Sequence, residues 1–179
     1  SPEGMGDVDL ATTGYGQGIA VTPIQILCAV NSFGNDGVLM KPKLVKRIID
    51  SEGKTVRTIE DTEVRRVVSS ETAEKMRDIM EYYVADSGSG DQAYVPGYRV
   101  GGKTGTANLV EGGRYAKNAT NTSFVAMAPM DDPQISMIVI VYRPTKVQYG
   151  NFTAGPIVKE IMEKSLQYLG VERQYTKSE

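Results

Sequence analysis

Three stretches of the chain place apolar residues at the spacing of an α-helix. The first starts at Thr22-Pro23, a hydroxyl N-cap followed by proline at the first helical position, and ends in the turn Gly34–Gly37. The second starts at Ser69 or Ser70, and the third at about Gly155. The apolar positions of the last two are Ala73, Met76, Met80, Tyr83 and Val84, and then Ile157, Val158, Ile161, Met162, Leu166 and Leu169.

Other stretches carry the β-branched and alternating residues that favour strands. LVKRIID and KTVRTIE flank a Ser51-Glu52-Gly53 turn and predict a hairpin. Three more strands are expected at Tyr98–Asn108, Thr122–Ala128 and Ile135–Tyr142, with turns at Glu111-Gly112-Gly113 and at 130–133. Their short connections predict an antiparallel meander. The last strand is almost wholly apolar, which predicts burial on both faces.

This order of elements predicts an α+β domain. We expect an antiparallel sheet covered by helices, with the C-terminal helix packed on the sheet. Four regions follow along the chain: an irregular segment over 1–18, a helix, hairpin and helix over 19–96, strands over 97–143, and a C-terminal helix over 154–170. A length of 179 residues is sufficient for one compact domain with a core.

The composition of the chain excludes several kinds of binding and catalytic site. The net charge of −2 gives no basic footprint for nucleic acid, and no apolar run is long enough to span a bilayer. The chain has no histidine, which excludes Ser-His-Asp and Cys-His machinery within it. Its single cysteine, Cys28, lies in an apolar stretch and is interpreted as a buried hydrophobe. Asp131-Asp132-Pro133 is interpreted as a turn and not a cation site, so no metal or cofactor is expected.

One segment, GYRVGGKTGTAN, matches two unrelated patterns. Gly97 to Thr104 is a formal match to the phosphate-binding P-loop, which requires a helix directly after the motif. Here Gly105, Thr106 and Asn108 follow, which are poor helix formers. The second pattern is a K-T-G triad on a strand, Lys103-Thr104-Gly105.

The K-T-G pattern has a chemical rationale on a strand. Strand alternation places Lys103 and Gly105 on one face and Thr104 on the other. The ammonium group attracts a substrate carboxylate or activates a neighbouring hydroxyl, and glycine lets an extended peptide approach the strand edge. The backbone amides of that edge then pair with substrate and stabilise an oxyanion. Lys103 alone is equally well explained as a solvated strand lysine.

The blocks around this segment resemble the class B (monofunctional) penicillin-binding proteins. The resemblance rests on GYGQGIAVTPIQ, GYRVGGKTGTA and AGPIVKEIMEKSLQYLG in this order, from about Asp9 to Leu169. It implies the serine β-lactamase/transpeptidase-like fold. It also implies that Lys103 and Thr104 position a carboxylate, that Gly105 keeps the cleft open and that Thr106 supplies an oxyanion-hole N–H. Lys103 and Thr106 are thus the implied catalytic residues, and Asn108 is a further, weaker binding candidate.

The family's machinery also needs an S-x-x-K nucleophile and an S-x-N element. Ser51-Glu52-Gly53-Lys54 matches the first by letter, but it falls in the predicted hairpin turn and in the wrong order. Ser89 is a loop serine and no convincing S-x-N. We therefore expect the nucleophile before Ser1 and expect the 179-residue piece alone to be inactive. Because parts that normally pack on the missing portion stay exposed, we also expect the piece to self-associate.

The resemblance implies a peptidoglycan D,D-transpeptidase at the outer face of a bacterial membrane, anchored by an N-terminal segment. Its expected partners are D-Ala-D-Ala stem peptides and β-lactams, with other cell-wall synthesis proteins possible and no nucleic acid. Two alternatives stay open: a penicillin-binding fold that serves as a non-catalytic scaffold, and a nucleotide binder through Gly97–Thr104. An S-x-x-K upstream would favour the enzyme, and an ATP titration tests the nucleotide binder.

Overall fold

The computed structural model describes residues 4–112 and 114–174. Its helices are α1 (Asp7–Gly14), α2 (Pro23–Gly34), α3 (Ser70–Val84), α4 (Gly150–Thr153) and α5 (Gly155–Tyr168), with a 3-10 turn at Asp91–Ala93. Its strands are β1 (Val38–Met40), β2 (Arg47–Ile49), β3 (Thr55–Thr58), β4 (Glu63–Arg66), β5 (Gly101–Glu111), β6 (Arg114–Ala128) and β7 (Ile135–Tyr142). The predicted mixture of helices and antiparallel strands is confirmed.

The main sheet is the predicted meander, with strand order β5-β6-β7. Both neighbouring pairs are antiparallel, and Lys103 lies opposite Val125. The predicted bounds of β7 are confirmed, whereas those of the first two strands are wrong. β5 starts three residues later than Tyr98 and runs on to Glu111, and β6 starts at Arg114 because the hairpin pairs almost to its tip. Gly113, part of the predicted turn, lies outside the described residues.

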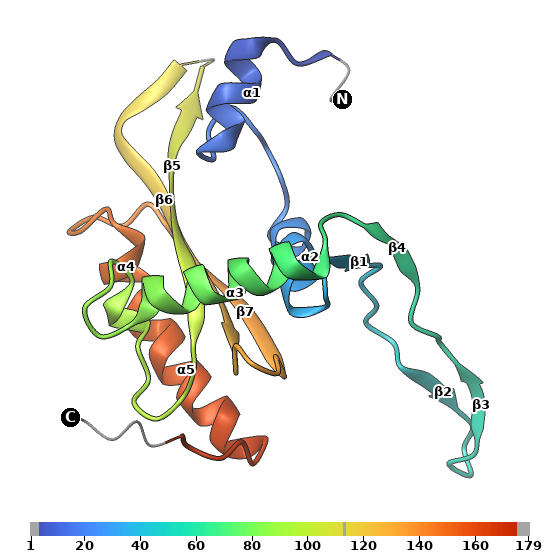
Figure 1. Cartoon of the computed structure of the whole chain (residues 1–179). Helices are drawn as coiled ribbons and strands as arrows, with labels where there is room; N and C mark the ends of the chain where they lie inside the picture. The colour runs from blue at the N-terminus through green and yellow to red at the C-terminus, as the bar shows by residue number, and fades with distance from the viewer. Residues whose placement is uncertain (1–3, 113, 175–179) are drawn as a thin grey trace.

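Helices cover both faces of this sheet (Figure 1). Alternate residues of β6 point to opposite faces: Phe124 joins a cluster with Val158 and Leu166 of α5, whereas Met127 joins Met80 of α3. The expectation that α5 covers one face is confirmed. The expectation that β7 is buried on both faces is wrong, because β7 is an edge strand whose residues are half-buried up to Val141 and exposed at Tyr142.

Capping residues determine where α2 and α3, the two helices on the other face, begin. The Thr22 hydroxyl accepts the Gln25 amide and Pro23 follows, which confirms the predicted start of α2. Ser69 caps α3 by accepting the amide of Thr72 at 3.1 Å. Cys28 on α2 is half-buried and not fully buried as expected, because this part of α2 is only partly covered.

The segment over 1–18 is not irregular as predicted, since it contains α1. The helix has no buried residue, so it needs no apolar stripe, and the sequence carries no helical pattern of apolar positions there. Its stabilisation is local: the Asp9 carboxylate accepts the Gly6 amide at 3.1 Å, and Asp7 adds a second negative charge at the N-terminal end of the helix dipole.

Residues 38–66 form an arm whose β2-β3 end stands away from the main sheet, whereas β1 at its base contacts α2 (Figure 1). The predicted hairpin is confirmed as the antiparallel pair β2-β3, and Ser51–Lys54 lies in its turn, which confirms that this S-x-x-K match is not at a helix start. A second pair, β1-β4, was not predicted. The EVRR run is β4, and it is solvent-exposed as expected.

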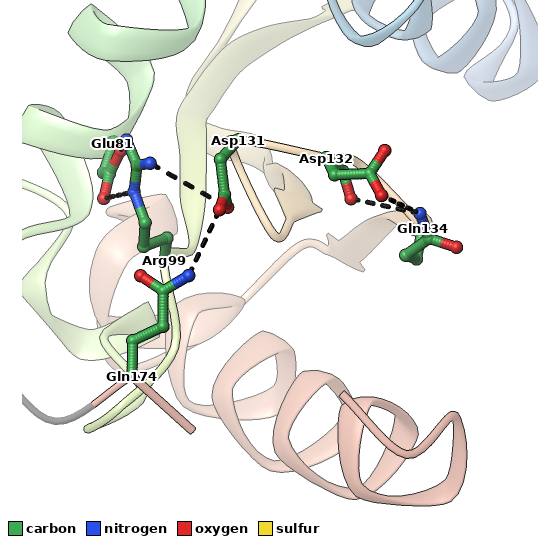
Figure 2. A network of polar contacts seen from close by, with 6 residues as sticks. All are labelled: Glu81, Arg99, Asp131, Asp132, Gln134 and Gln174. Carbon is green, nitrogen blue, oxygen red and sulfur yellow. Dashed lines mark hydrogen bonds and ion pairs between the residues drawn. The ribbon is translucent and has the colours of Figure 1, made fainter. Parts of the chain in front are cut away.

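A network of charged and amide side chains fixes α3 against the start of β5 (Figure 2). Arg99 donates two hydrogen bonds to the Glu81 carboxylate, at 2.8 and 2.6 Å. Asp131, in the turn between β6 and β7, lies 3.9 Å from the same guanidinium and accepts a hydrogen bond from Gln174. The hydrogen bonds to Glu81 raise the pKa of Arg99. A bidentate pair of this kind sets direction as well as distance.

Candidate active site

All five predicted site residues lie on β5, the strand at one edge of the main sheet. Lys103, Thr106 and Asn108 are exposed, whereas Thr104 and Gly105 are half-buried. The segment after Lys103-Thr104 is thus an extended strand and not a helix, so the structural context of a P-loop is absent. The nucleotide-binding alternative is therefore not supported.

Lys103 and Thr104 form a small polar cluster with a tyrosine of α3. The Lys103 ammonium donates to the Thr104 carbonyl at 3.0 Å and to its hydroxyl at 3.3 Å. The Tyr83 hydroxyl lies 2.6 Å from the Thr104 hydroxyl, and the ammonium lies 4.8 Å from the centre of the Tyr83 ring. Sequence reasoning assigned Tyr83 only to the apolar face of its helix. The signal it missed is that a covered phenol needs a hydrogen-bond partner.

Two glycines allow close packing around this cluster. A Cβ at Gly105 would lie 2.4 Å from the hydroxyl of Ser123, its partner across the strands. A Cβ at Gly150, the first residue of α4, would lie 2.5 Å from the Ser123 carbonyl and 3.2 Å from the Thr104 side chain. Glycine therefore lets α4 approach the K-T-G strand directly.

The Thr106 end of the motif contacts the N-terminal segment. The Gln17 side chain donates to the Thr106 carbonyl at 3.3 Å, although the two residues are 89 positions apart. This contact brings the GYGQG block to the K-T-G strand, a proximity that the residues alone did not predict. Asn108 lies two residues further along, opposite Thr120.

Two cavities meet at the cluster. A polar cavity of about 420 Å³ is lined by Tyr83, Ser89, Asp91, Thr104, Thr106 and Asn151, among others. A larger groove of about 850 Å³, mostly apolar, extends from Lys103 between α2 and α3. Ile79 in this groove is 59% exposed, in keeping with the expected open apolar surface.

Self-association of the 179-residue chain stays a prediction. Sedimentation velocity over a range of concentrations tests it, and a single monomer species throughout would contradict it.

The wall of the polar cavity carries a negative charge. Asn151 donates to the Asp91 carboxylate at 2.8 Å, while its own carbonyl oxygen accepts the Gln92 amide. The Asn151 hydrogen bond, supported by Gln92, lowers the pKa of Asp91 and so favours the ionised form of this carboxyl. The turn at Asp131–Pro133 is confirmed between β6 and β7, and no cluster of metal-ligand side chains occurs within residues 4–112 and 114–174. Over the same ranges, no helix has the length and apolar character to cross a membrane.

Residues 3–163 match the family model described as the penicillin binding protein transpeptidase domain. Among curated relatives, Stage V sporulation protein D of Bacillus subtilis is 44% identical over 172 residues. That match covers 95% of this chain and 26% of the relative. A probable peptidoglycan D,D-transpeptidase, PenA of Neisseria flavescens, is 33% identical over 92% of this chain and 38% of the relative.

Solved structures give the same result. Penicillin-binding protein 3 of Mycobacterium tuberculosis, complexed with ampicillin, superposes with a TM-score of 0.88 at 25% identity, over all of this chain and 42% of that one. The transpeptidase domain of penicillin-binding protein 3 from Burkholderia pseudomallei gives a TM-score of 0.76 at 32% identity, over 97% of this chain and 50% of that one.

The chain therefore belongs to the penicillin-binding protein transpeptidase domain family. Its fold is part of the β-lactamase/transpeptidase fold, as the sequence resemblance implied. The chain spans about a quarter to two fifths of the length of these two curated relatives.

Proposed function

We propose that this chain forms the K-T-G wall of a serine D,D-transpeptidase that cross-links peptidoglycan. The observation that carries the proposal is the position of Lys103, Thr104 and Thr106 on an edge strand, where all three line the apolar groove and Thr104 and Thr106 also line the polar cavity. Membership of the transpeptidase family and the named activity of a relative support it. The ampicillin complex of a structural neighbour supports binding of β-lactams at this fold.

In this proposal, the nucleophilic serine lies in another part of the whole protein. Its oxygen attacks the carbonyl of the penultimate D-Ala of a stem peptide, and the terminal D-Ala leaves as an amine that takes up a proton. The resulting ester is passed to the amine of a second stem peptide, which restores the serine. A β-lactam forms the same ester by ring opening and is not released quickly.

The K-T-G strand has separate roles at its successive positions. The Lys103 ammonium and the Thr104 hydroxyl bind the carboxylate of the substrate or drug. Gly105 leaves space for the acyl chain beside the strand, and the Thr106 amide donates to the oxyanion. Asn108 is the outermost binding residue, because it is exposed two positions beyond Thr106.

The site of action in this proposal is the outer face of a bacterial cell membrane, to which the whole protein is anchored by a segment outside this chain. Other cell-wall synthesis proteins are its expected partners. The family of the chain supports this placement, since its relatives include a probable peptidoglycan D,D-transpeptidase.

Labelling with a fluorescent penicillin tests the proposal. The longer protein that contains this chain is expected to form a covalent adduct that survives denaturation, and prior benzylpenicillin is expected to prevent it. The 179-residue chain alone is expected to stay unlabelled. Labelling of the isolated chain would contradict the proposed place of the nucleophile. A longer protein with an S-x-x-K motif that stays unlabelled would overturn the enzymatic function and leave the scaffold alternative.

A further inference from the structure

Tyr83 is held in place from two sides. Two residues before it on α3, Glu81 forms the bidentate ion pair with Arg99 that fixes the helix against the start of β5 (Figure 2). From the other side, a Cβ at Gly90 would lie 2.7 Å from the Tyr83 ring, so the 86–90 loop packs directly on it. The Gly90 amide also donates to the Tyr83 carbonyl at 2.8 Å. The ring therefore has little freedom to turn away from β5.

The hydroxyl of this fixed ring reaches the centre of the K-T-G motif. It lies 2.6 Å from the Thr104 hydroxyl, a short distance for two hydroxyl oxygens. The same ring lies 4.8 Å below the Lys103 ammonium, within the range of a cation–π contact. Tyr83 and Thr104 also line both the polar cavity and the apolar groove, so they form part of the wall between them.

We infer that Tyr83 is a positioning residue for carboxylate recognition by Lys103 and Thr104. This inference rests on the proposed function. Tyr83 acts through Thr104: its phenol donates a hydrogen bond to the Thr104 oxygen and thereby sets the direction of the threonine's own proton.

The number of donors and acceptors at Thr104 determines where its proton points. The Thr104 hydroxyl has one proton and two lone pairs, and the Lys103 ammonium can only donate. When Lys103 and Tyr83 both donate to the Thr104 oxygen, its two lone pairs are occupied. The threonine proton then points away from both and is available to a carboxylate oxygen. Without the phenol, only the Lys103 bond orients the hydroxyl, so its proton can also point to the side that the phenol occupied.

Packing alone does not require the phenol oxygen. A phenylalanine ring would keep the contacts with Gly90 and the ring face below Lys103, and it would lose only the bond to Thr104. Tyr83→Phe therefore separates the hydrogen bond from the packing. Tyr82→Phe is the matched control, because Tyr82 is the neighbouring residue on α3 and is 80% exposed.

The test measures acylation of the longer protein by benzylpenicillin, followed by competition with a fluorescent penicillin. Tyr83→Phe is expected to lower k2/K, the second-order acylation constant, about 5- to 10-fold, the typical value of one hydrogen bond. The loss should appear in K, the dissociation constant of the non-covalent penicillin complex. The rate constant of the acylation step, k2, should stay nearly unchanged. Thr104→Val removes the same bond from the other side, and the double variant should be no slower than Thr104→Val alone. Tyr82→Phe should match the wild-type rate.

A penicillin methyl ester supplies the readout that a merely structural role would not produce. The ester lacks the carboxylate, so Tyr83→Phe should acylate with it as fast as the wild-type protein does. Equal losses with acid and ester would overturn the inference, as would an unchanged Tyr83→Phe rate or strictly additive variants. A wild-type protein that no penicillin acylates would instead overturn the proposed function, and the inference with it. Thermal unfolding of each variant checks that the fold is kept.

Discussion

The main sheet and the arm are built from similar residues but differ in what covers them. β5, β6 and β7 lie between α5 on one face and α2 with α3 on the other, and Phe124 in the middle strand is 0% exposed. In the arm, every residue of β2, β3 and β4 is exposed, including Ile48 and Ile49. Strand pairing alone thus does not create a rigid site. The K-T-G residues are positioned because their sheet is packed on both sides.

The largest expected effect on stability comes from removing a large buried side chain at the centre of the main sheet. Phe124→Ala should lower the free energy of unfolding by about 3–5 kcal/mol, because the ring is fully buried between the sheet and α5. Ile48→Ala in the arm removes a side chain that is 47% exposed and should cost less than about 1 kcal/mol. Urea denaturation of both variants measures the difference. Similar losses would show that the arm is packed in solution.

A smaller effect is expected from adding one methyl group where α4 meets β5. Gly150→Ala places a Cβ 2.5 Å from the Ser123 carbonyl and should cost about 1–3 kcal/mol, with slower penicillin acylation because α4 must move from Thr104. Gly53→Ala in the arm is the control: its Cβ meets nothing within 4 Å, and only its positive φ of 82° is unfavourable. It should leave acylation unchanged. An acylation loss in Gly53→Ala would contradict the separation of the two regions.

Ion pairs should show the same contrast on a smaller scale. Glu81→Gln weakens the partly buried, bidentate contact with Arg99 and should cost roughly 1 kcal/mol. Asp61→Asn breaks the pair with Lys43 at the base of the arm, where the carboxylate side chain is 76% exposed, and should cost about 0.5 kcal/mol or less. Thermal unfolding at low and high salt compares them. A larger loss for Asp61→Asn would reverse the ranking.

The smallest expected effect is a pH dependence beside the site. Because its folded-state pKa is lowered, ionised Asp91 stabilises the fold above its unfolded-state pKa, and this contribution disappears as the pH falls through the lower, folded-state value. Asn151→Ala should raise the pKa of Asp91 toward its ordinary range and flatten this acid dependence. NMR titration of the Asp91 carboxyl measures the shift, and an unchanged pKa in the variant would contradict the assigned cause.

The sequence predicts best what local signals determine. The cap at Thr22, the cap at Ser69 and the bounds of β7 depend on neighbouring residues, and all three are confirmed. α1 was missed because it buries no residue and so carries no periodic pattern. The β1-β4 pair was missed because two short strands meet across more than 20 residues of intervening chain.

In the candidate site, too, the local features were predicted and the long-range contacts were not. The K-T-G letters and their strand were predicted, because a short motif followed by poor helix formers is a local feature. The partners of the motif were not. Tyr83 lies 21 positions from Thr104 and Gln17 lies 89 from Thr106, so only the packing of α3 and the N-terminal segment brings them together. The roles of Lys103, Thr104, Gly105, Thr106 and Asn108 stay predictions.

The Gln17 contact has a consequence for the solubility of the protein. An edge strand with free backbone acceptors is a template for pairing with the edge of another copy, which leads to aggregation. Gln17 occupies one such acceptor on β5 with a neutral bond of 3.3 Å between exposed groups. A neutral bond of this kind contributes about 1 kcal/mol or less, so a chain that pairs with β5 has to replace only one weak contact at this position. The Gln17 side chain thus covers one backbone acceptor of the strand edge with a weak contact that another chain can replace.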